Sequence, residues 1–169
     1  LPYYAASPIL RHFLESDWPP TIAVVMVQRE VAKNMTAQPG EMSLMSVGVQ
    51  LYGKPRIVGY VPPSAFYPQP KVTSAVVRIE VYPKPAVGFD DRRAFFEVVR
   101  AGFSAPRKQL RNSLSNGLGV PTEEGEAILQ AAGVDPHRRA ESLTLQEWCA
   151  LYHAARELGT AKAMVSPSP

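Results

Sequence analysis

Two short loops carry side chains that could hold a flat ring bearing an amine. The first is Leu1-Pro2-Tyr3-Tyr4, at the start of the printed sequence. A residue before proline is held in an extended conformation, so we expect the Leu1 carbonyl to point out of the backbone beside Tyr3. That carbonyl could accept a hydrogen bond from an exocyclic amine while the aromatic face stacks on the ring. A plain strand-to-helix turn is the simpler interpretation of these four residues alone.

The second loop is Phe66-Tyr67-Pro68-Gln69-Pro70-Lys71, which follows Pro62-Pro63. Prolines stiffen the backbone, so Phe66 and Tyr67 have little conformational freedom left to lose on binding. Rigid aromatic side chains on a loop favour stacking with a nucleic-acid base. A hydrophobic plug between two strands is the alternative for the same Phe-Tyr pair, so neither loop decides the function by itself.

The sequence contains no motif for a metal site, a nucleophilic triad or a phosphate-binding loop. His12, His137 and His153 have no partner at the spacing of metal ligands, so we expect no metal ion. Neither a serine nor Cys149 lies in a recognisable nucleophile turn. Gly117-Leu118-Gly119 precedes a proline, which is typical of a helix C-cap rather than of a phosphate-binding loop.

Composition predicts a globular protein without a membrane segment. Residues 22–27 form the longest apolar run, far too short to span a bilayer, and no charged-then-apolar leader opens the sequence. The single cysteine, Cys149, excludes an internal disulfide and fits a reducing compartment. We therefore expect a cytoplasmic protein with no membrane partner.

Basic residues gather at two places in the second half of the chain. They are Arg100, Arg107, Lys108 and Arg111 in one group and Arg138-Arg139 in the other. The net charge of +3 and a pI near 9.1 are compatible with a phosphate-bearing partner. An ordinary solvated basic face is an equally good explanation of the charge alone.

Up to residue 82 the pattern alternates between helix and strand. Ser7-Pro8 has the form of a helix start, and Pro19-Pro20 ends that helix. Residues 21–28 are a continuous β-branched run, the pattern of a strand buried on both faces of a parallel sheet. Further helices are expected over 29–37 and 42–52, and strands over 56–61 and 72–82. Together these elements predict α/β organisation.

A proline-marked junction at 82–85 separates this region from a helical one. We place a domain boundary there, with a first domain over 1–83 and a second over 84–159. Helices are expected over 90–103, 108–118, 122–132 and 143–158. The small, polar segment 160–169 is expected to be a disordered tail.

Taken in order, these segments resemble the ribosomal RNA adenine dimethyltransferases of the KsgA type. The family's catalytic signature is Asn-Leu-Pro-Tyr, and the printed sequence starts at its second residue. Further matching segments are Val27–Ala32, Leu44–Val47 with Gln50, the proline loop and strand Phe66–Val77, Phe95–Leu114, and the turn Arg139–Leu143. The proline-rich signature is specific, and the resemblance covers almost the whole chain.

The resemblance implies methyl transfer from S-adenosylmethionine to the exocyclic amines of two adjacent adenosines in small-subunit rRNA, within the immature small ribosomal subunit. The implied catalytic residues are Leu1, Pro2, Tyr3 and Phe66. The Leu1 carbonyl would bind the amine together with the family's Asn, Tyr3 would stack on the adenine, and Phe66 would close the other face of the flipped-out base. The candidate RNA-binding residues are Arg107, Lys108, Arg111, Arg138, Arg139 and Lys71.

The resemblance also implies a fold: the later half of a Rossmann-like methyltransferase sheet, followed by a small all-helical domain. The family's Asn, its glycine-rich turn and its acidic ribose-binding residue are not in the printed sequence. We therefore expect a fragment that has no cofactor-binding residues, does not methylate alone, and needs the missing N-terminal half to complete its sheet.

Two alternatives stay open. The helical domain from Phe89 onward could be a binding module that docks on structured RNA without chemistry. The chain could also belong to an antibiotic-resistance methyltransferase acting on large-subunit rRNA. The C-terminal helices and the Arg139-Ala140-Glu141 turn favour the small-subunit enzyme. DNA adenine methyltransferases are disfavoured because their signature typically has a second proline where Leu1 stands.

Overall fold

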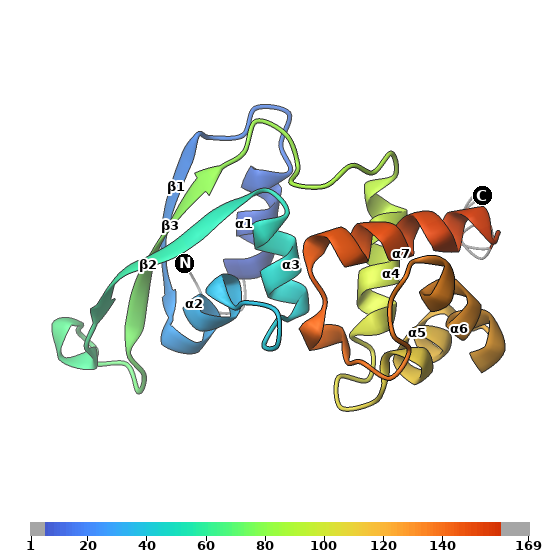
Figure 1. Ribbon diagram of the computed structural model, residues 1–169. Coiled ribbons are helices and arrows are strands. Elements are labelled where there is room, and N and C mark those ends of the chain that lie inside the picture. The colour runs from blue at the N-terminus through green and yellow to red at the C-terminus, as the bar shows by residue number, and fades with distance from the viewer. Residues whose placement is uncertain (1–5, 160–169) are drawn as a thin grey trace, which may run out of the picture. The chain divides into compact units, whose positions relative to one another are not determined.

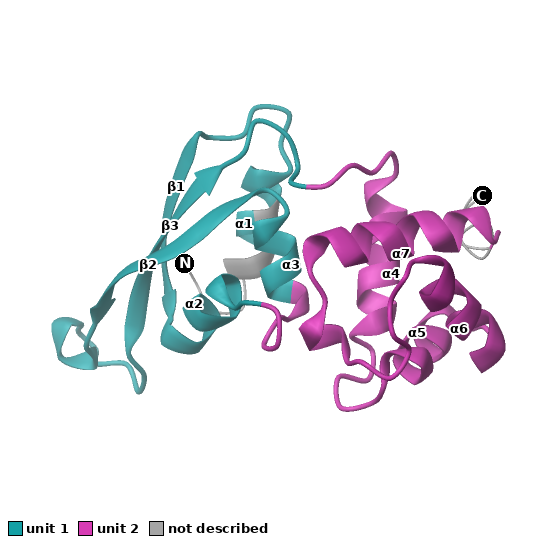
Figure 2. Cartoon of the chain, in the orientation of Figure 1, with its two compact units in different colours: residues 1–38, 45–86 teal, residues 39–44, 87–169 magenta. Residues whose placement is uncertain are grey.

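The chain divides into two compact units, which are described separately. The structure is a computed structural model that describes residues 6–159 (Figure 1). The first unit comprises residues 1–38 and 45–86, and the second comprises residues 39–44 and 87–169 (Figure 2). The chain thus passes into the second unit close to the proline-marked junction. Segment 39–44, which the sequence placed in the first domain, belongs to the second unit by its contacts. The expected tail and Leu1, Pro2 and Tyr3 lie outside the described residues.

The first unit contains a three-stranded sheet in the order β1-β3-β2. Its elements are α1 (Ala6–Leu14), β1 (Ile22–Gln28), α2 (Arg29–Thr36), α3 (Leu44–Gln50), β2 (Gly53–Val61), the short 3₁₀ turn η1 (Pro63–Ala65) and β3 (Ser74–Val81). The predicted helices and strands are all present. β2 begins before the predicted Arg56 because Gly53 pairs with Val81. A Cβ on Gly53 would lie 2.7 Å from the Glu80 carbonyl oxygen, so this close approach requires glycine.

The prediction of a parallel strand buried on both faces was wrong for β1. β1 pairs antiparallel with β3, and β2 does the same on the other side of β3. Ile22 and Val24 point to one face of the sheet and are 48% and 61% exposed. The β-branched run specified an extended backbone, but β propensity carries no information about the direction of the partner strand.

The opposite face of the sheet forms the core of the first unit. Ala75, Val77 and Ile79 alternate along β3 and are fully buried, and α2 packs against all three strands. The Gln50 side chain, at the end of α3, donates hydrogen bonds to the carbonyls of Met35 at 2.9 Å and Ala37 at 2.8 Å. These carbonyls close α2 and have no partner within the helix, so Gln50 holds the end of α2 against α3.

Replacing Gln50 with leucine is expected to destabilise this chain by about 2 kcal/mol, because two part-buried carbonyls lose their hydrogen-bond donors. Urea denaturation followed by circular dichroism measures the change. Gln38→Leu is the matched control, since the Gln38 amide makes one exposed contact, to the Thr36 carbonyl at 3.3 Å. Equal losses for the two variants would contradict the capping role of Gln50.

The second unit is a helical domain with an aromatic core. It contains α4 (Arg92–Gly102), α5 (Leu110–Leu118), α6 (Thr122–Ala131), the 3₁₀ turn η2 (Ala140–Ser142) and α7 (Leu145–Glu157). Phe95, Trp148 and Tyr152 are fully buried in it. Gly119 ends α5 with a φ of +70°, so the predicted C-cap role of the 117–119 segment is confirmed. The expected combination of an α/β region and a helical domain is confirmed.

Candidate functional site

The proline loop lines a pocket at one end of the sheet in the first unit. The pocket has a volume of about 260 Å³ and is lined by Met26, Val27, Phe66, Tyr67, Pro68, Pro70 and Ser74. Phe66 is half-buried, whereas the Tyr67 side chain is completely exposed. Met26 and Val27 belong to β1, and they reach the loop because Met26 pairs with Val76 of β3. Sequence inspection singled out Phe66 but missed the two β1 residues.

Hydrogen bonds brace the proline loop at both ends. At its start, the backbone N–H groups of Ala65 and Phe66 donate to the carbonyls of Pro62 at 3.0 Å and Pro63 at 3.2 Å. At its end, the Arg29 N–H donates to the Thr73 carbonyl at 3.0 Å and ties the start of α2 to the strand that follows the loop. Phe66 is therefore presented by a backbone fixed on two sides, which lowers the entropy cost of stacking.

The walls of this pocket are apolar and aromatic and carry no charged side chain. Ser74, which is 4% exposed, and Tyr67 contribute the side-chain hydroxyls. Within residues 6–159, no group of three or more His, Cys, Asp or Glu side chains could hold a metal ion. Such a pocket suits a planar ring held by stacking, and it supplies position rather than acid–base chemistry.

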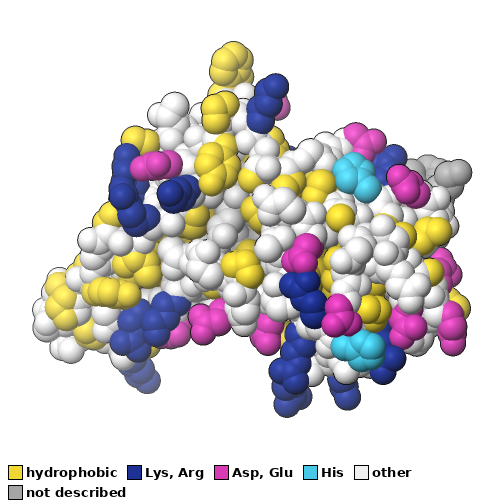
Figure 3. Space-filling view, viewed as in Figure 1, with side chains coloured by type: hydrophobic (Ala, Val, Ile, Leu, Met, Phe, Trp, Pro, Cys, Tyr) yellow, Lys and Arg dark blue, Asp and Glu magenta, His cyan; other side chains and the backbone are white. Residues whose placement is uncertain are grey.

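In the second unit, two loops join to form a basic surface. The Leu110 N–H donates to the Arg138 carbonyl at 2.7 Å, and the Arg111 N–H donates to the Pro136 carbonyl at 3.2 Å. These bonds hold the loop before α5 against the loop before η2. Three exposed side chains on the two loops, Arg107, Lys108 and Arg139, are called the basic rim below. Figure 3 shows Lys and Arg side chains gathered at the lower edge of the second unit.

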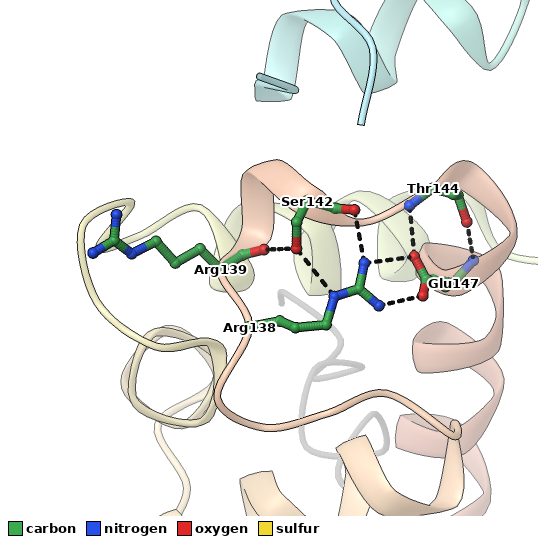
Figure 4. A network of polar contacts seen from close by, with 5 residues as sticks. All are labelled: Arg138, Arg139, Ser142, Thr144 and Glu147. Atoms are coloured by element: carbon green, nitrogen blue, oxygen red, sulfur yellow. Dashed lines mark hydrogen bonds and ion pairs between the residues drawn. The ribbon is translucent and has the colours of Figure 1, made fainter. Parts of the chain in front are cut away.

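Two of the other predicted RNA-binding arginines are engaged within the protein. Arg111 forms an ion pair with Glu126 at 3.1 Å. The Arg138 guanidinium binds both carboxylate oxygens of Glu147, and it also donates to the Ser142 hydroxyl at 3.1 Å and the Ser142 carbonyl at 2.7 Å (Figure 4). Figure 4 shows the neighbouring Arg139 side chain extending away from this network. Adjacent arginines thus have different environments.

Glu147 is the anionic centre of the network. The hydrogen bonds from Arg138 hold the pKa of the Glu147 carboxyl below its usual value, so this group is ionised at neutral pH. Lys71, the remaining candidate, is exposed on the proline loop of the first unit. Among residues 6–159, no helix combines the length and the apolar character needed to cross a membrane.

Residues 1–157 match the protein family described as ribosomal RNA adenine dimethylase. The chain belongs to this family. The resemblance of the proline loop and of the C-terminal helices to rRNA adenine dimethyltransferases is therefore confirmed.

Curated relatives of this chain carry the name ribosomal RNA small subunit methyltransferase A. A protein of Dehalococcoides mccartyi is 48% identical over 156 residues, which cover 90% of this chain and 53% of the relative. A protein of Desulfitobacterium hafniense is 47% identical over 156 residues, covering 91% of this chain and 56% of the relative. The chain spans about half the length of the curated relatives it matches.

Solved structures place this chain in the methyltransferase fold. A dimethyladenosine transferase from Plasmodium falciparum superposes with a TM-score of 0.79 at 22% identity, covering 94% of this chain and 66% of that chain. The 23S rRNA methyltransferase ErmE superposes with a TM-score of 0.63 at 25% identity, covering 91% of this chain and 62% of that chain. The expected methyltransferase architecture is thus confirmed.

Proposed function

We propose that this chain is the part of a small-subunit rRNA adenine dimethyltransferase that holds the target adenine and recognises the rRNA. The observation that carries the proposal is the braced, aromatic pocket at Phe66, in a chain that belongs to the adenine dimethylase family. The names of the curated relatives favour the small ribosomal subunit over the large one as substrate. The protein would act in the cytoplasm on immature small subunits.

The chemical task is to make a poor nucleophile react. The exocyclic amine of adenine delocalises its lone pair into the ring, so it must be held in a defined orientation toward the methyl donor. We propose that Phe66 stacks on one face of the flipped-out adenine and Tyr3 on the other. Pro2 keeps Leu1 extended, so that the Leu1 carbonyl accepts a hydrogen bond from the amine. The residues of this chain then act by positioning, with no side-chain base.

We propose that the pocket at the proline loop holds the target base and not S-adenosylmethionine. The pocket at the proline loop has no carboxylate to bind ribose hydroxyls and no charged group to bind the methionine portion of the cofactor. We therefore place the cofactor site in the part of the relatives that this chain does not match. We propose that a segment corresponding to this part of the relatives works together with the residues described above.

The outer face of the sheet is the surface on which we place this missing part. Ile22, Val24 and Met26 of β1 lie side by side on that face, and all three are at least one-third exposed. Within the described residues, β1 also has one edge without a strand partner. Exposed apolar side chains beside a free strand edge favour association with further sheet and helices.

The proposal is tested by restoring the missing part. The portion of the Dehalococcoides mccartyi relative that this chain does not match is joined to it, and transfer of a radiolabelled methyl group to immature small subunits is measured. The chimeric protein is expected to methylate adjacent adenosines, whereas this chain alone is expected to transfer nothing. Transfer by the chain alone would overturn the assignment, and transfer only to large subunits would favour the large-subunit alternative.

The basic rim supports a second candidate function, that of an RNA-binding module without chemistry. Arg107, Lys108 and Arg139 are exposed on a unit with a core of its own. If the folded chimeric protein bound small subunits tightly but transferred no methyl group, this second function would be the better description.

A further inference from the structure

We propose that Arg138 is a positioning residue, which fixes the loop that carries Arg139 so that the basic rim keeps one geometry for rRNA. The inference rests on the proposed function and changes the role of Arg138 from a direct RNA contact to a support.

The Arg138 guanidinium is almost fully used within the second unit. Two of its nitrogens meet the two carboxylate oxygens of Glu147, and its remaining bonds go to the hydroxyl and carbonyl of Ser142. This two-pronged geometry suits the planar guanidinium and cannot be reproduced by lysine. Four of the five guanidinium N–H groups are used in these bonds, so a phosphate could make a two-pronged contact with Arg138 only by displacing Glu147 or Ser142.

Glu147 connects Arg138 to a rigid element. The Glu147 carboxylate also accepts the Thr144 N–H at 2.8 Å, while the Thr144 hydroxyl accepts the Glu147 N–H at 3.2 Å, which forms a capping box at the start of α7. The next residue, Trp148, is fully buried. Arg138 therefore fastens its loop to a helix that the core of the second unit holds in place.

Backbone carbonyls of this loop and of η2, which directly follows it, reach two other segments. The carbonyls of Arg138 and Pro136 accept the first N–H groups of α5, which begins two residues after Lys108. The Glu141 carbonyl accepts the N–H groups of Gly40 at 2.8 Å and Met42 at 3.1 Å, and so holds segment 39–44. If the loop were loosened, the distances from Arg139 to Arg107 and Lys108 would vary. Segment 39–44 would also lose its fixed hydrogen-bond acceptor.

A change of charge at Glu147 distinguishes the two possible roles of Arg138, because they predict opposite changes in RNA affinity. Glu147→Gln removes a negative charge, so electrostatics alone predicts tighter RNA binding, and a released Arg138 would add to it if Arg138 contacted RNA. The positioning role predicts weaker binding. Glutamine still accepts the Thr144 N–H, so the cap of α7 is retained.

The experiment measures binding of this chain to small-subunit rRNA by fluorescence anisotropy across a range of salt concentrations. Glu147→Gln is expected to weaken binding about fivefold. The slope of the logarithm of the binding constant against the logarithm of the salt concentration, called the salt slope below, is expected to fall in magnitude by about one, which corresponds to one lost phosphate contact. Arg138→Lys keeps the positive charge but loses the two-pronged contact with Glu147, so it is expected to weaken binding and lower the salt slope to a similar extent. The matched control is Glu123→Gln, since Glu123 is exposed on α6 and should leave affinity unchanged or slightly higher.

Hydrogen exchange separates this inference from the proposed function. In Glu147→Gln, the amides of Gly40, Met42, Leu110 and Arg111 are expected to exchange faster than in the parent chain, whether or not RNA is bound. Unchanged exchange at these amides, or tighter RNA binding by Glu147→Gln, would overturn the positioning role. If instead the parent chain did not bind rRNA while the amides responded as expected, the proposed function would fail and the support of the loop by Arg138 would stand.

Discussion

Phe66→Ala in the chimeric enzyme is expected to lower turnover about 100-fold, while rRNA affinity changes less than about twofold. Stacking on one base contributes about 1–3 kcal/mol, and in the proposed reaction that contact orients the amine for attack. Most of the rRNA contact would lie elsewhere, on the basic rim, so affinity should survive. Single-turnover methyl transfer and a separate binding titration measure the two quantities.

Tyr67→Ala is the matched control for this variant. Tyr67 is the neighbouring aromatic residue on the same loop, but its side chain is completely exposed, whereas Phe66 is half-buried. We expect Tyr67→Ala to lower turnover only a few-fold. Equal losses of turnover and affinity in Phe66→Ala would identify Phe66 as a docking contact and would remove it from the catalytic pocket.

Arg107→Glu combined with Lys108→Glu is expected to weaken binding of this chain to small-subunit rRNA between about 10-fold and 100-fold. Both side chains are exposed on the basic rim, and each phosphate contact that is lost lowers the salt slope by about one. We therefore expect the slope to fall by about two. Anisotropy titrations over a series of potassium chloride concentrations give both numbers.

A charge-matched control distinguishes the rim from a general effect of net charge. Lys54→Glu combined with Lys84→Glu changes the net charge by the same amount on exposed residues of the first unit. Binding by this control is expected to stay within about threefold of the parent chain, because these residues are outside the rim. A loss as large as that of the rim variant would show that overall charge, rather than this surface, sets the affinity.

Sequence alone was sufficient for the elements whose signals are local. The helix expected over 143–158 is present as α7, and that expected over 108–118 is present as α5, because apolar spacing and capping act within a few residues. Phe66, which the sequence singled out beside the stiffening prolines, lines the pocket, and its contact with adenine stays a prediction. Both predicted starts lie two residues too early, at 108 and 143, whereas α5 begins at Leu110 and α7 at Leu145. For α5, the first N–H groups bond to the carbonyls of Arg138 and Pro136 on a distant loop, which local sequence does not reveal.

Tertiary structure decided the features that depend on partners far along the chain. Arg138 and Arg139 are the same residue type side by side, yet Arg138 is bound by Glu147 and Arg139 is exposed. Met26 joins Phe66 in one pocket only because β1 pairs with β3, and the direction of that pairing was not readable from the β-branched run. Local sequence specifies backbone conformation and the charge available, whereas the fold determines which charges are neutralised within the protein and which face outward.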